Sequence, residues 1–167
     1  MRPGRFFRHF WTGGWTINRV FPAHTMRAIT REIRATERTH RGEIVFAVQA
    51  ALDFWRLVQG ESARERAVEV FSDLHIWDTE HNNGVLIYLL LADRDVEIVA
   101  DRGIHLRCGA QVWEEICRSM EAEFRAGRFE EGVTLGVRAI GEHLSRHYPG
   151  DDTHINELPD RPVIIRD

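Results

Sequence analysis

The amino-acid sequence predicts an α/β fold, a three-layer α/β/α sandwich with a small mixed sheet that contains a central antiparallel hairpin. Three observations lead to this prediction. Short apolar runs have the length of strands, longer segments carry apolar residues at helical spacing, and a four-residue polar turn joins two of the apolar runs. At 167 residues, with 43% hydrophobic and 29% charged residues, the chain has the size and composition of one globular domain.

The first predicted helix begins near Pro22, because proline suits the first turn of a helix. Met26, Ile29 and Ile33 then recur at spacings of three and four, and the pattern continues to about His40. We therefore expect an amphipathic helix with its apolar side against the core.

A first strand is predicted at residues 43–48 (EIVFAV), which are largely apolar at both alternating sets of positions. Such a strand is expected between two layers of helices. A second helix is predicted from Ser62, where Glu65 three residues later completes a capping box. The inner face of this helix is formed by apolar residues: Ala63, Ala67, Val70, Phe71 and Leu74.

The hairpin comprises residues 85–91 (VLIYLLL), the polar turn at 92–95 and a second run at 96–100. The first run is apolar throughout, which indicates a central strand, whereas the second alternates as a strand with one partly wet face does. Two further helices are predicted at residues 110–126 and 129–148, each with apolar residues at helical spacing.

We expect three parts along the chain: a basic aromatic arm at residues 1–20, the α/β domain at 21–149 and an extended tail at 150–167. No apolar stretch has the length of a membrane-spanning helix, and the N-terminus lacks the apolar region of a secretory signal. Cys108 and Cys117 lie about half a helical turn apart in orientation and are poor disulfide partners. These features favour a cytoplasmic protein with reduced thiols.

Charge is distributed unevenly along the chain. Residues 1–42 contain nine arginines and two acidic residues, whereas residues 43–167 contain 13 arginines and 24 acidic residues. A basic arm of this kind can contact an anionic surface or fold back on its own acidic body. No nucleic-acid partner is expected, because the acidic body would repel phosphate.

Four segments carry a resemblance to a known family: HRGEIVFAV at 40–48, the hairpin led by Asn82-Asn83-Gly84, the turn Asp101-Arg102-Gly103-Ile104, and FRAGRFEEGV at 124–133. Over about residues 21–148 the chain resembles the TPM domain, in a shorter soluble branch of that family. The resemblance implies an α/β/α sandwich. It also links the chain to acid phosphatase activity, divalent-cation binding and the assembly or repair of membrane complexes, with no catalytic motif implied.

A polar loop before the central strand is the first candidate for a functional site. Asp78, Glu80 and Asn82 offer oxygen ligands at alternate positions, a spacing that lets one loop wrap a hard cation such as Ca²⁺ or Mg²⁺. Asp101 follows the neighbouring hairpin strand at the end where this loop enters the sheet, so we expect it beside them. These four residues are the predicted metal ligands. The alternative is that the loop only provides the turn geometry from which the strand begins.

The same carboxylates also fit a metal-dependent acid phosphatase. In that case Asp101 and Arg102 are the catalytic candidates, with the arginine holding phosphate. The sequence has no Cys-x5-Arg motif and no glycine-rich phosphate cradle, so a phosphatase is the alternative to a non-enzymatic module.

The arm, RFFRHFWTGGWTINRVF at 5–21, combines arginines with aromatic residues, as interfacial membrane helices do. Gly13-Gly14 would limit a helix here to about three turns. We therefore expect the aromatic side chains to pack as additional core, with peripheral membrane contact through residues 1–15 as the alternative.

The leading functional hypothesis is a cytoplasmic, non-enzymatic module that binds a divalent cation or a protein partner at the acidic sheet edge and serves a membrane-associated complex. A phosphatase and a peripheral membrane adaptor are the alternatives. No organic cofactor is expected, because the apolar stripes of the helices are explained by the core.

Overall fold

The computed structural model describes residues 3–150 and 156–166. Residues 1–2, 151–155 and 167, which belong to the predicted arm and tail, lie outside the described residues. The described chain forms these elements: α1 (Pro3–Trp11), α2 (Gly14–Val20), α3 (Ala23–Glu37), β1 (Glu43–Gln49), α4 (Phe54–Gln59), α5 (Ala63–Asp73), β2 (Gly84–Leu90), β3 (Asp95–Ala100), α6 (Arg102–Cys108), α7 (Ala110–Arg125), α8 (Phe129–His147) and β4 (Val163–Ile165).

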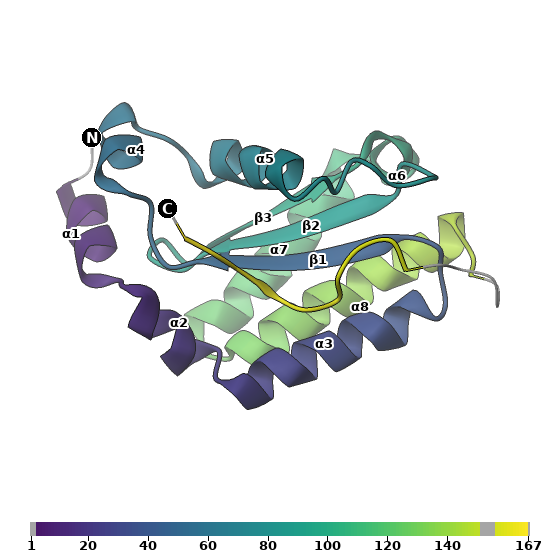
Figure 1. The fold of residues 1–167 in the computed structure, drawn as a ribbon, viewed down its shortest axis with the longest axis horizontal. Helices are drawn as coiled ribbons and strands as arrows, with labels where there is room; N and C mark the ends of the chain where they lie inside the picture. Colours follow the sequence, from purple (N-terminus) through teal and green to yellow (C-terminus); the bar gives the residue numbers. More distant parts are fainter. Residues whose placement is uncertain (1–2, 151–155, 167) are drawn as a thin grey trace.

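The strands form one mixed sheet in the order β3-β2-β1-β4. Strand β1 runs parallel to β2, with Glu43 opposite Gly84, and also parallel to β4. Strands β2 and β3 are antiparallel, with Val85 opposite Ala100, and form the predicted hairpin. The fully apolar β2 is an interior strand, as expected, whereas β3 lies at an edge of the sheet (Figure 1).

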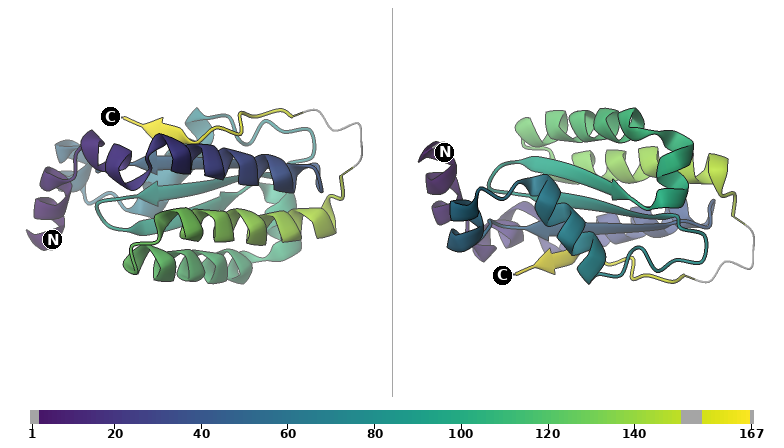
Figure 2. Two further views of the ribbon diagram at one scale, coloured as in Figure 1. Left: turned by 90° about the horizontal axis from the view of Figure 1, so that it is seen from below. Right: turned by 90° about the horizontal axis from the view of Figure 1, so that it is seen from above.

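Helices cover both faces of the sheet, which confirms the predicted α/β/α sandwich. Helices α3, α7 and α8 lie on one face and α5 lies on the other (Figure 2). Successive side chains of a strand point to opposite faces of the sheet. Phe46 and Ile87 enter the first core, which lies between the sheet and helices α3, α7 and α8. Val45, Leu86 and Tyr88 enter the second core, which lies between the sheet and α5. Burying each of these large side chains contributes roughly 1.5–3 kcal/mol.

The described part of the arm forms α1 and α2 rather than one helix. Ile17 of α2 is buried in the first core and His9 of α1 is also buried, while Phe6 packs against the second core. The other large aromatic side chains of the arm are exposed: Phe7, Phe10, Trp11 and Trp15. The expectation that the arm packs as additional core therefore holds only in part.

Two short helices, α4 and α6, replace loops of the sequence prediction. Each follows a strand and begins at an aspartate that accepts a backbone N–H, Asp53 from Arg56 at 2.9 Å and Asp101 from Arg102 at 2.6 Å. With six and seven residues, these helices are too short to show an apolar periodicity.

The tail adds β4 to the sheet, a strand that the sequence analysis does not predict. Ala47 of β1 lies opposite Val163 of β4. Upstream of β4, the buried carboxylate of Glu43 accepts backbone N–H groups from Glu157 at 3.0 Å and from Leu158 at 3.2 Å. The segment is therefore held through its backbone N–H groups, which leave little trace in its own side-chain pattern.

Candidate functional site

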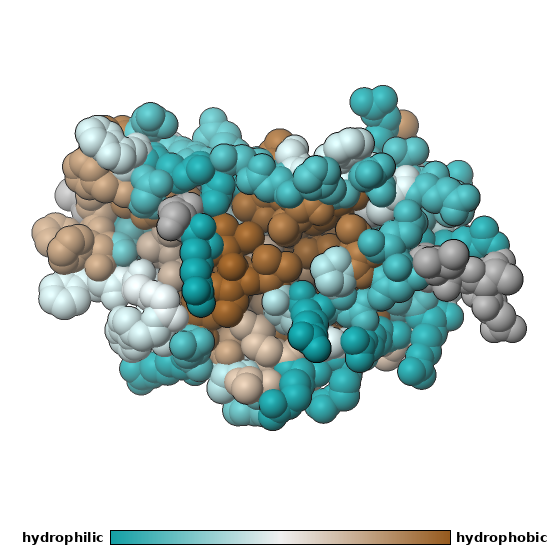
Figure 3. Space-filling model, viewed as in Figure 1, coloured by the Kyte–Doolittle hydropathy of each residue, from teal (hydrophilic) through white to brown (hydrophobic). Residues whose placement is uncertain are grey.

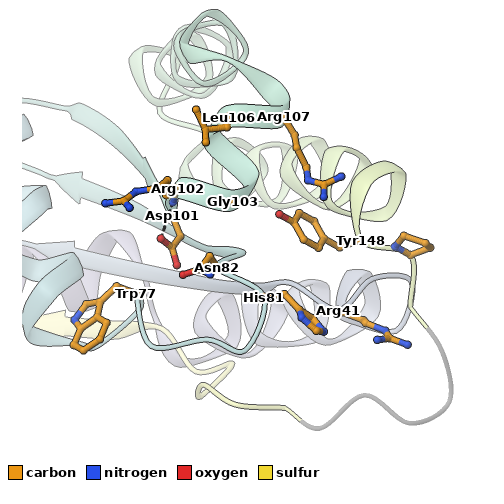
Figure 4. Close-up of a pocket in the computed structure, with 11 residues that line it drawn as sticks. Arg41, Trp77, His81, Asn82, Asp101, Arg102, Gly103, Leu106, Arg107 and Tyr148 are labelled. Carbon is orange, nitrogen blue, oxygen red and sulfur yellow. Dashed lines mark hydrogen bonds between the residues drawn. The ribbon is translucent and has the colours of Figure 1, made fainter.

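An open groove of about 1210 Å³ lies at the end of the sheet where β1 and β2 begin and β3 ends (Figure 4). We call it the arginine groove. Its lining combines the loop before β2, helix α6 and the end of α8: Arg41, Trp77, His81, Asn82, Asp101, Arg102, Gly103, Leu106, Arg107, Tyr148 and Pro149. Residues distant in the sequence meet here because parallel β1 and β2 begin side by side and antiparallel β3 returns to the same end.

Asp101 lies in this groove at the junction of β3 and α6. One carboxylate oxygen accepts the Arg102 N–H at 2.6 Å, and the other, Oδ2, is buried without a hydrogen-bond partner among the described residues. Burial raises the pKa of Asp101, although the bond from the Arg102 N–H and the nearby guanidinium group oppose the rise. Asp101 is thus a helix cap that also places a recessed carboxyl group in the groove.

The loop before β2 is pressed tightly against α6. Asn82 has a positive φ of 50°, and its carbonyl oxygen accepts the Ile104 N–H at 3.2 Å. A β-carbon at Gly103 would lie 2.8 Å from the Tyr148 hydroxyl oxygen and 2.9 Å from the carbonyl oxygen of His81. Glycine is therefore required in the first turn of α6, because only its backbone fits against the loop.

The walls of the groove are rich in positive charge. The Arg107 guanidinium carbon lies 4.9 Å from the centre of the Tyr148 ring, an arrangement typical of a cation–π contact. Arg41 and His81 lie across the groove from this pair, and Arg102 points toward the side that holds Trp77 (Figure 4). Among the described lining residues, three arginines and a histidine accompany the single carboxyl group of Asp101.

The structure brings together two of the four predicted metal ligands. Asn82 and Asp101 line the groove, whereas Asp78 and Glu80 are exposed and lie outside its lining. The reason is the residue between them, because Thr79 is buried and its hydroxyl accepts the Asn83 N–H at 3.2 Å. An inward Thr79 directs both flanking carboxylates to solvent.

The four residues therefore do not fit a common Ca²⁺ or Mg²⁺ site in this arrangement. The Oδ2 atom of Asp101 is recessed from the surface, and the carboxylates of Asp78 and Glu80 lie outside the groove. Within residues 3–150 and 156–166, no three histidine, cysteine or acidic side chains gather in a way that could hold a metal ion.

Sequence reasoning missed Arg41, Arg107 and Tyr148. The position of Arg41 could have been inferred once β1 and β2 were known to be parallel. With Glu43 opposite Gly84, a residue two positions before β1 lies near the loop two positions before β2. Arg107 and Tyr148 had no such signal, because their contact depends on the short helix α6.

The α/β/α sandwich and the groove beside the loop before β2 define the class of this domain. Comparison with known proteins identifies its family. The family model of the TPM domain matches residues 18–143. The chain belongs to the TPM domain family, as its motifs indicated. No curated protein sequence matches the chain significantly.

Two solved structures share the fold. The NMR structure of the BA42 protein from the psychrophilic bacterium Bizionia argentinensis has a TM-score of 0.76 and 27% identity, covering 86% of this chain and 94% of that one. The solution structure of the N-terminal domain of a protein from P. gingivalis has a TM-score of 0.61 and 18% identity, covering 77% and 81%. Among the described helices of this chain, none has the length and apolarity needed to cross a membrane.

Proposed function

We propose that this chain is a non-enzymatic TPM-type binding module whose arginine groove receives an acidic segment of a protein partner in a membrane-associated complex. The observation that carries the proposal is the charge of the lining, with Arg41, Arg102 and Arg107 around one recessed carboxyl group. Arginine pairs with carboxylates through two parallel hydrogen bonds, which gives both strength and orientation.

The exposed apolar side chains at the rim of the groove favour a protein over a small ion as the ligand. Leu106 is 77% exposed and Trp77 is 50% exposed, one on α6 and one on the opposite loop. Aromatic residues and arginine are the residue types enriched at the energetic centres of protein interfaces. Tyr148 holds Arg107 in place before binding, which lowers the conformational entropy lost on association.

The test uses calorimetric titration of a hexaglutamate peptide into the purified chain at low salt. We expect saturable binding that weakens about tenfold in the double variant Arg102→Gln/Arg107→Gln and weakens further as salt rises. Arg118→Gln is the matched control, because Arg118 is an exposed arginine on α7 outside the groove. Absence of binding, or an equal loss of affinity in the control variant, would contradict the proposal.

A calcium and magnesium titration separates this function from the cation site that the sequence predicted. The arginine lining disfavours a bare divalent cation by charge repulsion, so we expect no saturable binding up to millimolar ion. Saturable binding that disappears in Asp101→Asn would contradict the proposal and restore the cation hypothesis.

The phosphatase alternative has one observation in its favour. Asp101, with a raised pKa, and Arg102 line the same groove, as a proton donor and a phosphate clamp would. A generic phosphomonoester assayed between mildly acidic and neutral pH decides the matter. Turnover that is lost in Asp101→Asn would assign an enzyme, whereas the binding module has no turnover to lose.

A further inference from the structure

Helix α1 turns its polar side inward and its aromatic side outward. His9 is 4% exposed and Arg5 and Phe6 are partly buried, whereas Phe7, Phe10 and Trp11 are exposed by 69%, 85% and 74%. Burial of aromatic side chains is strongly favourable, so a helix that served only the core would present the opposite face.

The inward face of α1 is fixed by specific contacts. His9 Nδ1 accepts the backbone N–H of Leu52 at 3.0 Å, and His9 Nε2 lies 3.1 Å from Asp93 Oδ2. Arg5 and Arg8 also donate to the Asp93 carboxylate, at 2.8 and 3.0 Å. Burial alone would raise the pKa of Asp93, but bonds from His9, Arg5 and Arg8 outweigh it and hold the pKa well below its usual range. The outward orientation of the aromatic side chains is therefore set by the fold.

Helices α2 and α4 extend this exposed surface. The ring of Phe6 lies 6.0 Å from that of Phe54, which lies 5.5 Å from Trp55. We call this surface the aromatic end, and its six large side chains are 61–85% exposed: Phe7, Phe10, Trp11, Trp15, Phe54 and Trp55. Helices α1 and α4 lie together at the end of the molecule remote from α6 (Figure 1). Residues of hydrophobic and intermediate hydropathy, brown to white in Figure 3, protrude there.

Helices α1 and α2 bring positive charge to the aromatic end. Residues 3–20 contain Arg5, Arg8 and Arg19 and no acidic residue, and Arg8 keeps 57% of its side chain exposed while it contacts Asp93. Tryptophan and phenylalanine with flanking arginine are the residues that bind the interface of a bilayer, where rings enter the headgroup region and cations contact anionic lipids.

We propose that the aromatic end is a docking surface for lipid bilayers that carry anionic headgroups. Binding is peripheral and reversible, because α1 is a nine-residue helix that can enter only the interfacial layer. The expectation of membrane contact through residues 1–15 is thereby extended to α4. A chain docked in this way holds the arginine groove at its far end, facing the aqueous phase.

The test is co-sedimentation of the full chain with vesicles of phosphatidylcholine, alone or with about 30% phosphatidylglycerol. We expect binding to the anionic vesicles that decreases with salt and falls about tenfold in Phe10→Ser/Trp11→Ser. Both side chains point to solvent, so the substitution leaves the fold intact, which circular dichroism checks. Trp77→Ser is the control, because it removes an exposed tryptophan from the groove instead.

Three results would overturn the proposal. The first is absence of binding to anionic vesicles, and the second is equal binding by wild type and Phe10→Ser/Trp11→Ser. The third is concentration-dependent self-association without lipid that the same double variant abolishes, which would assign the aromatic end to a second copy of the chain. The arginine groove contributes no residue to this surface, so none of these results bears on the proposed function.

Discussion

At each end of the sheet an aspartate follows a strand and caps a short helix, but the surfaces formed at the two ends differ in chemistry. Asp53 follows β1 and caps α4 at the aromatic end, whereas Asp101 follows β3 and caps α6 at the arginine groove. The two strands finish at opposite ends because β1 is parallel to β2 and β3 is antiparallel to it. At one end the short helix contributes exposed rings, and at the other it contributes arginines beside a recessed carboxyl group.

This difference shows where the chain places its surface chemistry. The sheet and the long helices hold most of the apolar core. The exposed rings of the aromatic end and the arginines of the groove lie on the short helices, loops and element ends around that core. The two proposed surfaces share no residue and lie at opposite ends of the sheet, so each can be altered by substitution of exposed side chains without changing the other.

The largest expected effect comes from filling the space at Gly103. Gly103→Val forces a side chain against the carbonyl oxygens of His81 and Asn82 and the Tyr148 hydroxyl, and we expect a loss of about 3 kcal/mol in the free energy of unfolding. Urea denaturation measures this loss. Gly14→Ala is the control at the aromatic end, where nothing lies within 4 Å of the added carbon. A tolerated valine would mean that loop and α6 are not tightly packed.

A smaller loss of stability is expected when the contacts between α1 and Asp93 are weakened. Asp93→Asn weakens the contacts to His9, Arg5 and Arg8, and hydrogen bonds to charged groups contribute roughly 1.5–3 kcal/mol. We expect about 2 kcal/mol of local destabilisation, seen as faster amide hydrogen exchange in α1 with α6 unchanged. Asp73→Asn, at the exposed end of α5, should leave both helices as they are. Unchanged exchange in α1 would contradict the anchoring role.

The groove end also carries a partly buried acid, Glu37, that makes stability depend on pH. Burial raises the pKa of Glu37 to about 9, and nearby Glu43 and Asp160 add to the rise, while the Ile44 N–H opposes it. Because the folded state then holds a proton that the unfolded state has released, stability falls as pH rises from about 4.5 toward 9. The sign of this dependence follows from the linkage between proton binding and folding.

Glu37→Gln keeps an oxygen to accept the Ile44 N–H at 3.1 Å and removes the ionisable group. We expect the stability of this variant to vary less between pH 5 and 9. The control is Glu32→Gln on the same helix, which removes a surface ion pair with Arg138. If both variants kept the wild-type dependence of stability on pH in thermal denaturation, the proton on Glu37 would not be the cause.

The smallest effect concerns the cap of α4. Asp53→Ala removes the acceptor of the Arg56 N–H and should cost about 1 kcal/mol. It should also disorder Phe54 and Trp55, which weakens vesicle binding without changing peptide binding at the groove. A change in peptide affinity would show that the two ends are coupled.

The long elements of this fold could be predicted because their apolar periodicity is strong. The strand at 85–91 and the helices that pack on it follow from side-chain pattern alone. Helices α4 and α6 could not be predicted, since each has fewer than eight residues. Strand β4 was missed for a related reason, because its three residues are defined by pairing with β1.

The candidate site could be predicted only in part. Asn82 and Asp101 both line the groove, because antiparallel pairing determines where their strands begin and end. The position of Asp78 and Glu80 outside the groove could not be predicted, because the sequence of a loop does not reveal that Thr79 is buried. The positive charge of the groove comes from Arg102 together with Arg41 and Arg107, which are distant in the sequence and line the same groove only in the folded chain.

The proposed function requires the arginine groove to bind an anionic segment. The most direct test is amide NMR of the full chain during titration with hexaglutamate. If the groove binds the peptide, we expect saturable shifts in residues 77–83 and 101–107 and at Tyr148, with α1 and α4 unchanged. Shifts confined to α1 and α4, or no saturable shift in the groove, would contradict it.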